Sequence, residues 1–193
     1  MALEDIEFRT DVTVELIRHS ASDADVLFAA RVSTQGEQTL ESAAAHDAAT
    51  DRDQGLINYL MRDRHGSPFE HNSLTFYVQA PIFVFREFMR HRIASYNEES
   101  GRYRELRPVF YMPGPQRKLV QVGKPGAYDF EDGTAEQTAL VQDEIRTVCS
   151  AAYESYQRML EAGVAREVAR AVLPVTLYSS MYVTMNARSL MNF

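Results

Sequence analysis

The longest regular pattern in the sequence is a helical one that runs from about Thr134 to Ala162. Its apolar residues recur at intervals of three and four, which is the spacing of one face of an α-helix. Thr134 is a residue type that caps helix N-termini, and Gly163 is one that ends helices. A helix of this length is a main packing element of any fold that contains it. Its buried face is expected to comprise Leu140, Ile145, Val148, Ala152, Tyr156 and Met159.

Three other segments alternate with a period of two, which is typical of β-strands. They cover residues 12–17, 74–79 and 177–185, and Pro81 bounds the second one. Their order along the chain predicts a single α+β domain over residues 1–193, in which long helices pack against a mixed or antiparallel sheet. Further helices are expected at about 22–32, 53–65, 81–89 and 166–173, and a last one begins at its cap, Asn186. A loop or weak helix is expected at 35–52, and an irregular segment at 112–133.

Composition limits the class of protein further. The 193 residues carry a net charge of −7, which argues against a general nucleic-acid-binding surface. No apolar run approaches the roughly 20 residues of a membrane span, and the acidic start lacks the pattern of a signal peptide. Cys149 is the only cysteine, so an internal disulfide is excluded. We therefore expect a cytoplasmic protein without a nucleic-acid or membrane partner.

Arginine supplies 18 of the 20 basic residues, and six arginines fall between Arg86 and Arg107. The guanidinium group binds phosphate or carboxylate through two parallel hydrogen bonds. This local basic cluster in an acidic chain suggests a small anionic ligand. The alternative is a salt-bridged surface, because acidic residues are interleaved with the arginines: Glu87, Glu98, Glu99 and Glu105.

The segment from Arg90 to Tyr103 is the densest in polar residues. Ser95, Asn97, Ser100 and Gly101 favour loop conformations that leave backbone N–H groups free. Arginines beside such a loop are suited to holding a phosphate, and the alternative is again a salt-bridged helix end. Ser100 has no histidine or lysine base at a predictable spacing, so we expect it to act as a hydrogen-bond donor rather than a nucleophile.

Three histidines permit a further hypothesis, a metal-dependent hydrolase that uses His65, His71 and His91. Their spacing matches no standard metal motif and no cysteine supports it, so no metal site is expected. Cys149 lies among apolar residues in the long helical segment, far from a partner base, and is expected to be an unreactive core residue.

Taken together, these motifs resemble a known family. Arg90-His91-Arg92, then seven residues, then Ser100, is similar to the signature of the flavin-dependent thymidylate synthases. Four further segments look like family segments and occur in the same order, so that the resemblance runs from about Phe28 to the end: residues 65–71, 80–84, 166–174 and 186–193.

The resemblance implies a reductive methylation of dUMP to dTMP in a homotetramer whose active sites lie between subunits. It implies FAD as prosthetic group and hydride carrier, methylenetetrahydrofolate as carbon donor and NADPH as reductant. The residues that it places at FAD are Ser67, Arg90, His91, Arg92, Glu98, Asn186, Arg188 and Asn192. Those that it places at dUMP are Glu87, Arg90, Glu98, Glu99, Ser100, Gly101, Arg102 and Arg170, with the stretch from Glu98 to Arg102 coming from a neighbouring subunit.

The family also carries, on a helix that continues past the position of Phe193, an arginine that polarises the uracil ring. The printed sequence has no residue there, so we expect a C-terminal helical part to be missing and name no catalytic residue. The alternative function is a non-catalytic module of the same fold that binds nucleotide or flavin.

Overall fold

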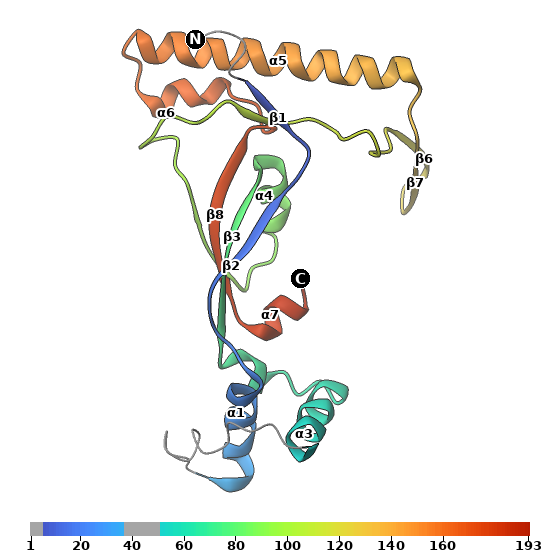
Figure 1. The fold of residues 1–193 in the computed structure, drawn as a ribbon, viewed down its shortest axis with the longest axis vertical. Coiled ribbons are helices and arrows are strands. Elements are labelled where there is room, and N and C mark those ends of the chain that lie inside the picture. The colour runs from blue at the N-terminus through green and yellow to red at the C-terminus, as the bar shows by residue number, and fades with distance from the viewer. Residues whose placement is uncertain (1–5, 37–50) are drawn as a thin grey trace. The chain divides into compact units, whose positions relative to one another are not determined.

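The computed structural model describes residues 6–36 and 51–193 (Figure 1). Most of the loop or weak helix expected at 35–52 lies outside these residues. The chain divides into two compact units, and each is assembled from three separate segments. The first unit contains residues 1–12, 79–88 and 98–180, and the second contains residues 13–78, 89–97 and 181–193.

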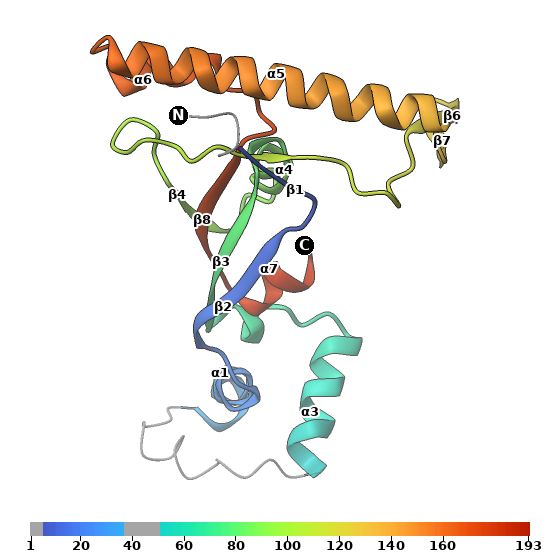
Figure 2. The same ribbon diagram turned by 45° about the horizontal axis from the view of Figure 1, so that its top comes forward.

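The first unit is built on α5 (Ala135–Glu161), which is the predicted long helix. Thr134 caps its N-terminus, with reciprocal hydrogen bonds to Gln137. In Figure 2, α6 (Arg166–Ala169) runs beside the C-terminal half of α5. The short turn η3 (Arg170–Val172) follows α6 directly. The core of this unit gathers Phe110, Cys149, Tyr153, Tyr156 and Leu177.

The buried face of α5 agrees with the predicted one in part. Tyr156 is buried as predicted, and Cys149 and Tyr153 are buried beside it, whereas Leu140 and Val148 are 60% and 54% exposed. The two tyrosines anchor the helix, because the Tyr153 hydroxyl donates to the Leu106 carbonyl at 3.0 Å and the Leu106 N–H donates to the Tyr156 oxygen at 3.2 Å. A tyrosine can thus pack in a core when its hydroxyl forms a hydrogen bond there, and a pattern of apolar residues alone does not include a residue such as Tyr153.

Short strands fill the rest of the first unit. β1 (Glu7–Arg9) pairs in parallel with β5 (Val109–Tyr111), and β6 (Val120–Lys124) pairs antiparallel with β7 (Ala127–Glu131). The prediction of an irregular segment at 112–133 is therefore wrong over the β6–β7 hairpin. The hairpin uses two glycines at positive φ, which any other L-residue would strain: Gly123 in β6 at 91° and Gly126 in the turn at 85°.

The second unit contains the helices nearest the candidate site. α1 (Asp23–Gln35) begins at a Ser22 capping box, and α3 (Asp51–Arg62) precedes the short turn η2 (Ser67–Glu70). α7 (Ala187–Met191) has Asn186 as its N-cap, as predicted. Val26, Leu60 and Phe69 form the buried cluster that these elements share, with Ala187 packed against it.

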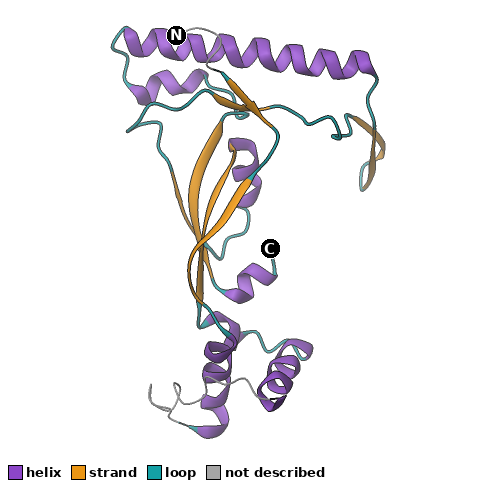
Figure 3. Cartoon of the chain, viewed as in Figure 1, coloured by secondary structure: helices purple, strands orange, loops and turns teal. Residues whose placement is uncertain are grey.

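The predicted strands are confirmed as β2 (Thr13–Ser20), β3 (Ser73–Pro81) and β8 (Tyr178–Met185). They form one sheet with β4 (Ser95–Glu98), in the order β2-β3-β8-β4 (Figure 3). β4 replaces the loop expected at its position. Pro81 ends β3, and α4 (Ile82–Phe88) begins after it.

The α+β class is confirmed, with both parallel and antiparallel strand pairs. The assignment of residues 1–193 to one domain stays a prediction. Among the described residues, the helices are each too short or too polar to cross a membrane.

Candidate functional site

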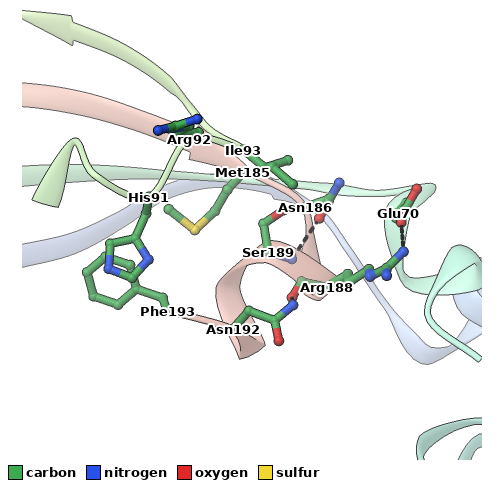
Figure 4. Close-up of a pocket in the computed structure, with 10 residues that line it drawn as sticks. All are labelled: Glu70, His91, Arg92, Ile93, Met185, Asn186, Arg188, Ser189, Asn192 and Phe193. Carbon is green, nitrogen blue, oxygen red and sulfur yellow. Dashed lines mark hydrogen bonds and ion pairs between the residues drawn. The ribbon is translucent and has the colours of Figure 1, made fainter. Parts of the chain in front are cut away.

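A cavity of about 390 Å³ lies in the second unit (Figure 4). Three elements converge on it: the η2 turn, the segment that precedes β4, and the end of β8 with α7. Five residues of the predicted flavin set line this cavity, namely His91, Arg92, Asn186, Arg188 and Asn192. The other lining residues are Glu70, Ile93, Met185, Ser189 and Phe193. The structure therefore brings together residues that lie about a hundred positions apart in the sequence.

Helix α7 presents the polar side chains of the cavity. The Asn186 side chain accepts a hydrogen bond from the Ser189 N–H at 2.9 Å, which starts the helix. Arg188 and Asn192 are four residues apart and share one face. The Asn192 amide donates to the Arg188 carbonyl at 3.0 Å and is held in place by that bond.

Arg188 is held by two features of the η2 region. Its guanidinium forms an ion pair with Glu70, which Figure 4 marks with a dashed line. It also passes so close to Gly66 that a Cβ atom there would lie 2.7 Å from the Arg188 Nε. Glycine at position 66 thus leaves the space that this side chain occupies.

Aromatic and cationic groups form the opposite wall. The rings of His91 and Phe193 lie 4.3 Å apart between centroids, with an interplanar angle of 39°. The Tyr96 hydroxyl donates to the His91 carbonyl, and burial raises the pKa of that hydroxyl. Arg92 has no ion-pair partner among residues 6–36 and 51–193. Its charge is available to an anionic ligand.

A second cavity of about 500 Å³ adjoins the same helix. Arg188 and Asn192 line both cavities, so the Arg188 side chain forms part of the wall between them. The remaining lining residues of the second cavity are mainly apolar or cationic: Leu60, Met61, Arg64, His65, Gly66, Phe69 and Met191.

Most of the predicted dUMP set lies in the first unit, around a buried glycine. A Cβ atom on Gly101 would lie 3.2 Å from the Arg170 Cδ and 2.8 Å from the Leu106 Cδ1, so Gly101 lets Arg170 pass closely. The neighbouring Ser100 hydroxyl accepts the Arg102 N–H at 3.3 Å. Arg102 forms an ion pair with Glu167 at 3.3 Å.

Glu99 is tied to β8 and to an arginine. Its N–H donates to the Ser180 carbonyl at 2.8 Å, and its carboxylate accepts from the Ser180 hydroxyl at 3.2 Å. Arg104 pairs with the same carboxylate at 3.4 Å. The cluster between Arg86 and Arg107 is thus partly salt-bridged, as one of the two alternatives predicts. Arg90 and Arg92, by contrast, make no ion pair within the part of the chain that the structure describes.

Nine predicted residues line neither cavity: Ser67, Glu87, Arg90, the stretch from Glu98 to Arg102, and Arg170. Ser67 and Arg90 are exposed in the second unit and line neither cavity, and Glu87 and Glu98 are exposed residues of the first unit. Sequence reasoning did not single out Glu70 as a residue of this cavity. Met185 belongs to the segment predicted as a strand at 177–185, while no signal in the sequence pointed to the contact between the Phe193 and His91 rings.

The other chemical hypotheses can be compared with the same geometry. Cys149 is buried, and burial raises the pKa of its thiol, in agreement with the predicted unreactive core residue. Within residues 6–36 and 51–193, no three histidine, cysteine or acidic side chains lie close enough to hold a metal ion. The structure therefore offers no support for the hydrolase hypothesis.

The sequence profile of the family described as "Thymidylate synthase complementing protein" matches residues 15–193. A flavin-dependent thymidylate synthase of Streptomyces avermitilis is 67% identical over 187 residues, which are 96% of this chain and 75% of that protein. One from Tropheryma whipplei is 63% identical over 186 residues, covering 96% of this chain and 76% of that protein.

Solved structures agree with this relationship. The UMP/dUMP methylase PolB from Streptomyces cacaoi, bound with 5-Br dUMP, is similar with a TM-score of 0.85 and 53% identity, covering 96% of this chain and 78% of that one. The same enzyme bound with 5-Br UMP gives a TM-score of 0.84 and 50% identity, covering 97% and 76%. From the profile match, the high identities and the shared fold, we conclude that this chain belongs to the flavin-dependent thymidylate synthase family of enzymes.

Proposed function

We propose that this chain takes part in the reductive methylation of dUMP to dTMP. In this reaction the hydrogen at C5 of the uracil ring is replaced by a methyl group. Methylenetetrahydrofolate provides the carbon and leaves as tetrahydrofolate, and NADPH provides the hydride and leaves as NADP⁺. The C5 hydrogen leaves as a proton, and the reaction takes up one proton from solvent overall. The observation that carries the proposal is the cavity in which five of the eight expected flavin residues meet.

The side chains around this cavity fit a flavin nucleotide. Guanidinium groups such as those of Arg92 and Arg188 bind phosphate oxygens, and asparagine amides can pair with the polar edge of a heterocycle. The paired rings of Phe193 and His91 add an aromatic surface to the cavity wall, and aromatic surfaces suit a heterocyclic ring. Bound FAD would supply hydride transfer to the substrate carbon. The chain's own residues bind and orient it.

The substrate assignment rests on the relatives and on the first unit. The structural relatives include an enzyme bound with 5-Br dUMP. Arg102 and Arg170, close to Gly101 and Ser100, give a cationic surface suited to a nucleoside monophosphate. A homotetramer with shared sites and a cytoplasmic location stay predictions.

Flavin binding and turnover test the proposal separately. We expect the purified chain to be yellow or to bind added FAD, and to release tritium from dUMP labelled at C5 when methylenetetrahydrofolate and NADPH are present. Arg92→Ala should weaken FAD binding by about tenfold or more, since it removes a charge-assisted contact. Arg117→Ala, which changes an exposed arginine of the first unit, is the matched control and should bind FAD normally.

Two results would count against this assignment in different ways. A colourless protein that binds no FAD would contradict the flavoenzyme. FAD and dUMP binding without tritium release would instead favour the alternative, a non-catalytic module of the same fold.

A further inference from the structure

The short helix α7 cannot keep its position by itself. It has five residues, and isolated helices of this length are unstable in water. It nevertheless carries Arg188 and is flanked by Asn186 and Asn192, three residues of the cavity wall. The geometry of that wall therefore depends on what anchors α7 to the rest of the second unit.

One anchor comes from the turn between η2 and β3. The side-chain oxygen of Asn72 accepts a hydrogen bond from the Ala187 N–H at 2.8 Å. Ala187 is the first residue of α7, and its N–H is one of the donors that a helix leaves unpaired at its N-terminus. Asn186 satisfies a different donor, the Ser189 N–H. Asn72 and Asn186 thus fix the start of the helix from two directions.

The nitrogen of the Asn72 amide indicates that the hydrogen bond from the Ala187 N–H is the role of this side chain. Its Nδ2 is buried and has no hydrogen-bond partner among the described residues. A buried donor without an acceptor destabilises the fold, and an apolar side chain would avoid that cost. The amide cannot turn around, because the Ala187 N–H requires an acceptor. The amide oxygen facing α7 is therefore the atom that accounts for asparagine at this position.

Glu70 lies two residues before Asn72 and forms the ion pair with Arg188. The same turn therefore holds α7 through its backbone and through its arginine. We propose that Asn72 is a positioning residue of the flavin cavity: it sets the place of α7, and through it the places of Arg188 and Asn192. This inference rests on the proposed function for its ligand, but the placement of α7 can be measured without one.

Three variants of the full chain test the inference. Asn72→Leu removes the acceptor and keeps the approximate size of the side chain. Asn72→Asp keeps an oxygen for the Ala187 N–H. The matched control is Thr75→Val, which breaks a partly buried hydroxyl contact of 2.9 Å with Thr184 in the same unit and leaves α7 untouched. Two readouts are needed, amide hydrogen exchange over residues 187–191 without ligand and the Kd for FAD.

We expect Asn72→Leu to speed the exchange of the α7 amides and to raise the Kd for FAD, each by about tenfold, as loss of one buried anchor predicts. Thr75→Val should change neither, although it lowers thermal stability. Asn72→Asp should keep the α7 protection, because its oxygen still accepts from the Ala187 N–H, but it places a carboxylate oxygen where the unpaired Nδ2 was and should lower thermal stability. Equal exchange in Asn72→Leu and Thr75→Val, or an unchanged Kd in Asn72→Leu, would overturn the inference.

If Asn72→Leu does not fold, Asn72→Asp decides alone, and loss of α7 protection in that variant overturns the inference. A wild-type chain that binds no FAD would contradict the proposed function. The exchange comparison would then still decide whether Asn72 anchors α7.

Discussion

At the scale of single residues, the wall between the two cavities depends on the small size of Gly66. Its φ of −75° suits any residue, so backbone strain is not the reason for glycine here. The reason is the Arg188 side chain, whose Nε and Cζ would lie 2.7 and 2.8 Å from an added Cβ. A single methyl group would therefore move the guanidinium without disturbing the fold around it.

Gly66→Ala should accordingly weaken FAD binding while leaving thermal stability nearly unchanged, because the flexible end of Arg188 gives way rather than the backbone. Gly55→Ala is the matched control. Gly55 lies within α3 with no atom near its missing Cβ, so alanine should stabilise that helix by about 0.5–1 kcal/mol and leave FAD binding as it is. Thermal unfolding and FAD titration measure both effects. Unchanged binding in Gly66→Ala would show that the position of Arg188 does not matter.

Cys149 permits a second prediction at this scale. Burial raises the pKa of the thiol, and a weak contact with the Thr176 hydroxyl at 3.5 Å only partly offsets that effect. A raised pKa means less thiolate at a given pH, and the thiolate is the species that reacts. At about pH 8, the native chain should therefore be alkylated by iodoacetamide far more slowly than the chain unfolded in urea. Mass spectrometry of the peptide that contains Cys149 measures both rates. Equal rates would contradict the buried, unreactive thiol.

At the scale of elements, the sequence predicted the long helix, the three longer strands and the capped helices, because capping residues and periodicity are local signals. The β6–β7 hairpin was missed because its turn glycines resemble those of an irregular loop. Tyr156 on α5 was predicted as buried, whereas Tyr153 was missed because its hydroxyl depends on a partner about fifty residues away. The same limit applies to the candidate site. Motifs in the sequence indicated Arg188, but its ion pair with Glu70 joins residues 118 positions apart, and local patterns do not show such a contact.

The packing of α1 against α3 also depends on a contact between residues that are far apart in the sequence. Arg31 and Asp53 form an ion pair in which both side chains are almost fully buried. Removing one partner leaves an uncompensated buried charge, which costs about 3–5 kcal/mol. Asp53→Ala should therefore lower the free energy of unfolding by about that amount, as measured by urea denaturation.

The double variant Arg31→Met with Asp53→Leu should recover most of the loss, because apolar residues can replace a buried pair. Asp63→Asn is the control, since the Arg62–Asp63 pair is largely exposed and should contribute no measurable stability. A loss in Asp53→Ala no larger than that in Asp63→Asn would mean that the buried pair does not join the two helices.

At the scale of the whole molecule, the two expected ligand sets divide between the two compact units. The cavity residues expected at FAD belong to the second unit, whereas the stretch from Glu98 to Arg102, together with Arg170, belongs to the first. In the predicted arrangement with sites shared between subunits, one chain would give its flavin half to one site and its nucleotide half to another.

Mixing two inactive variants tests that arrangement. Arg188→Ala should disable the flavin half and Arg102→Ala the nucleotide half, so each alone should release little tritium from dUMP. If the chain forms homotetramers with shared sites, co-expression of the two should restore activity, because about a quarter of the sites would combine two intact halves. The matched control is Arg188→Ala mixed with Arg92→Ala, two changes in the same half, which cannot complement each other. No recovery in the first mixture, with both chains shown to assemble together, would contradict sites shared between subunits.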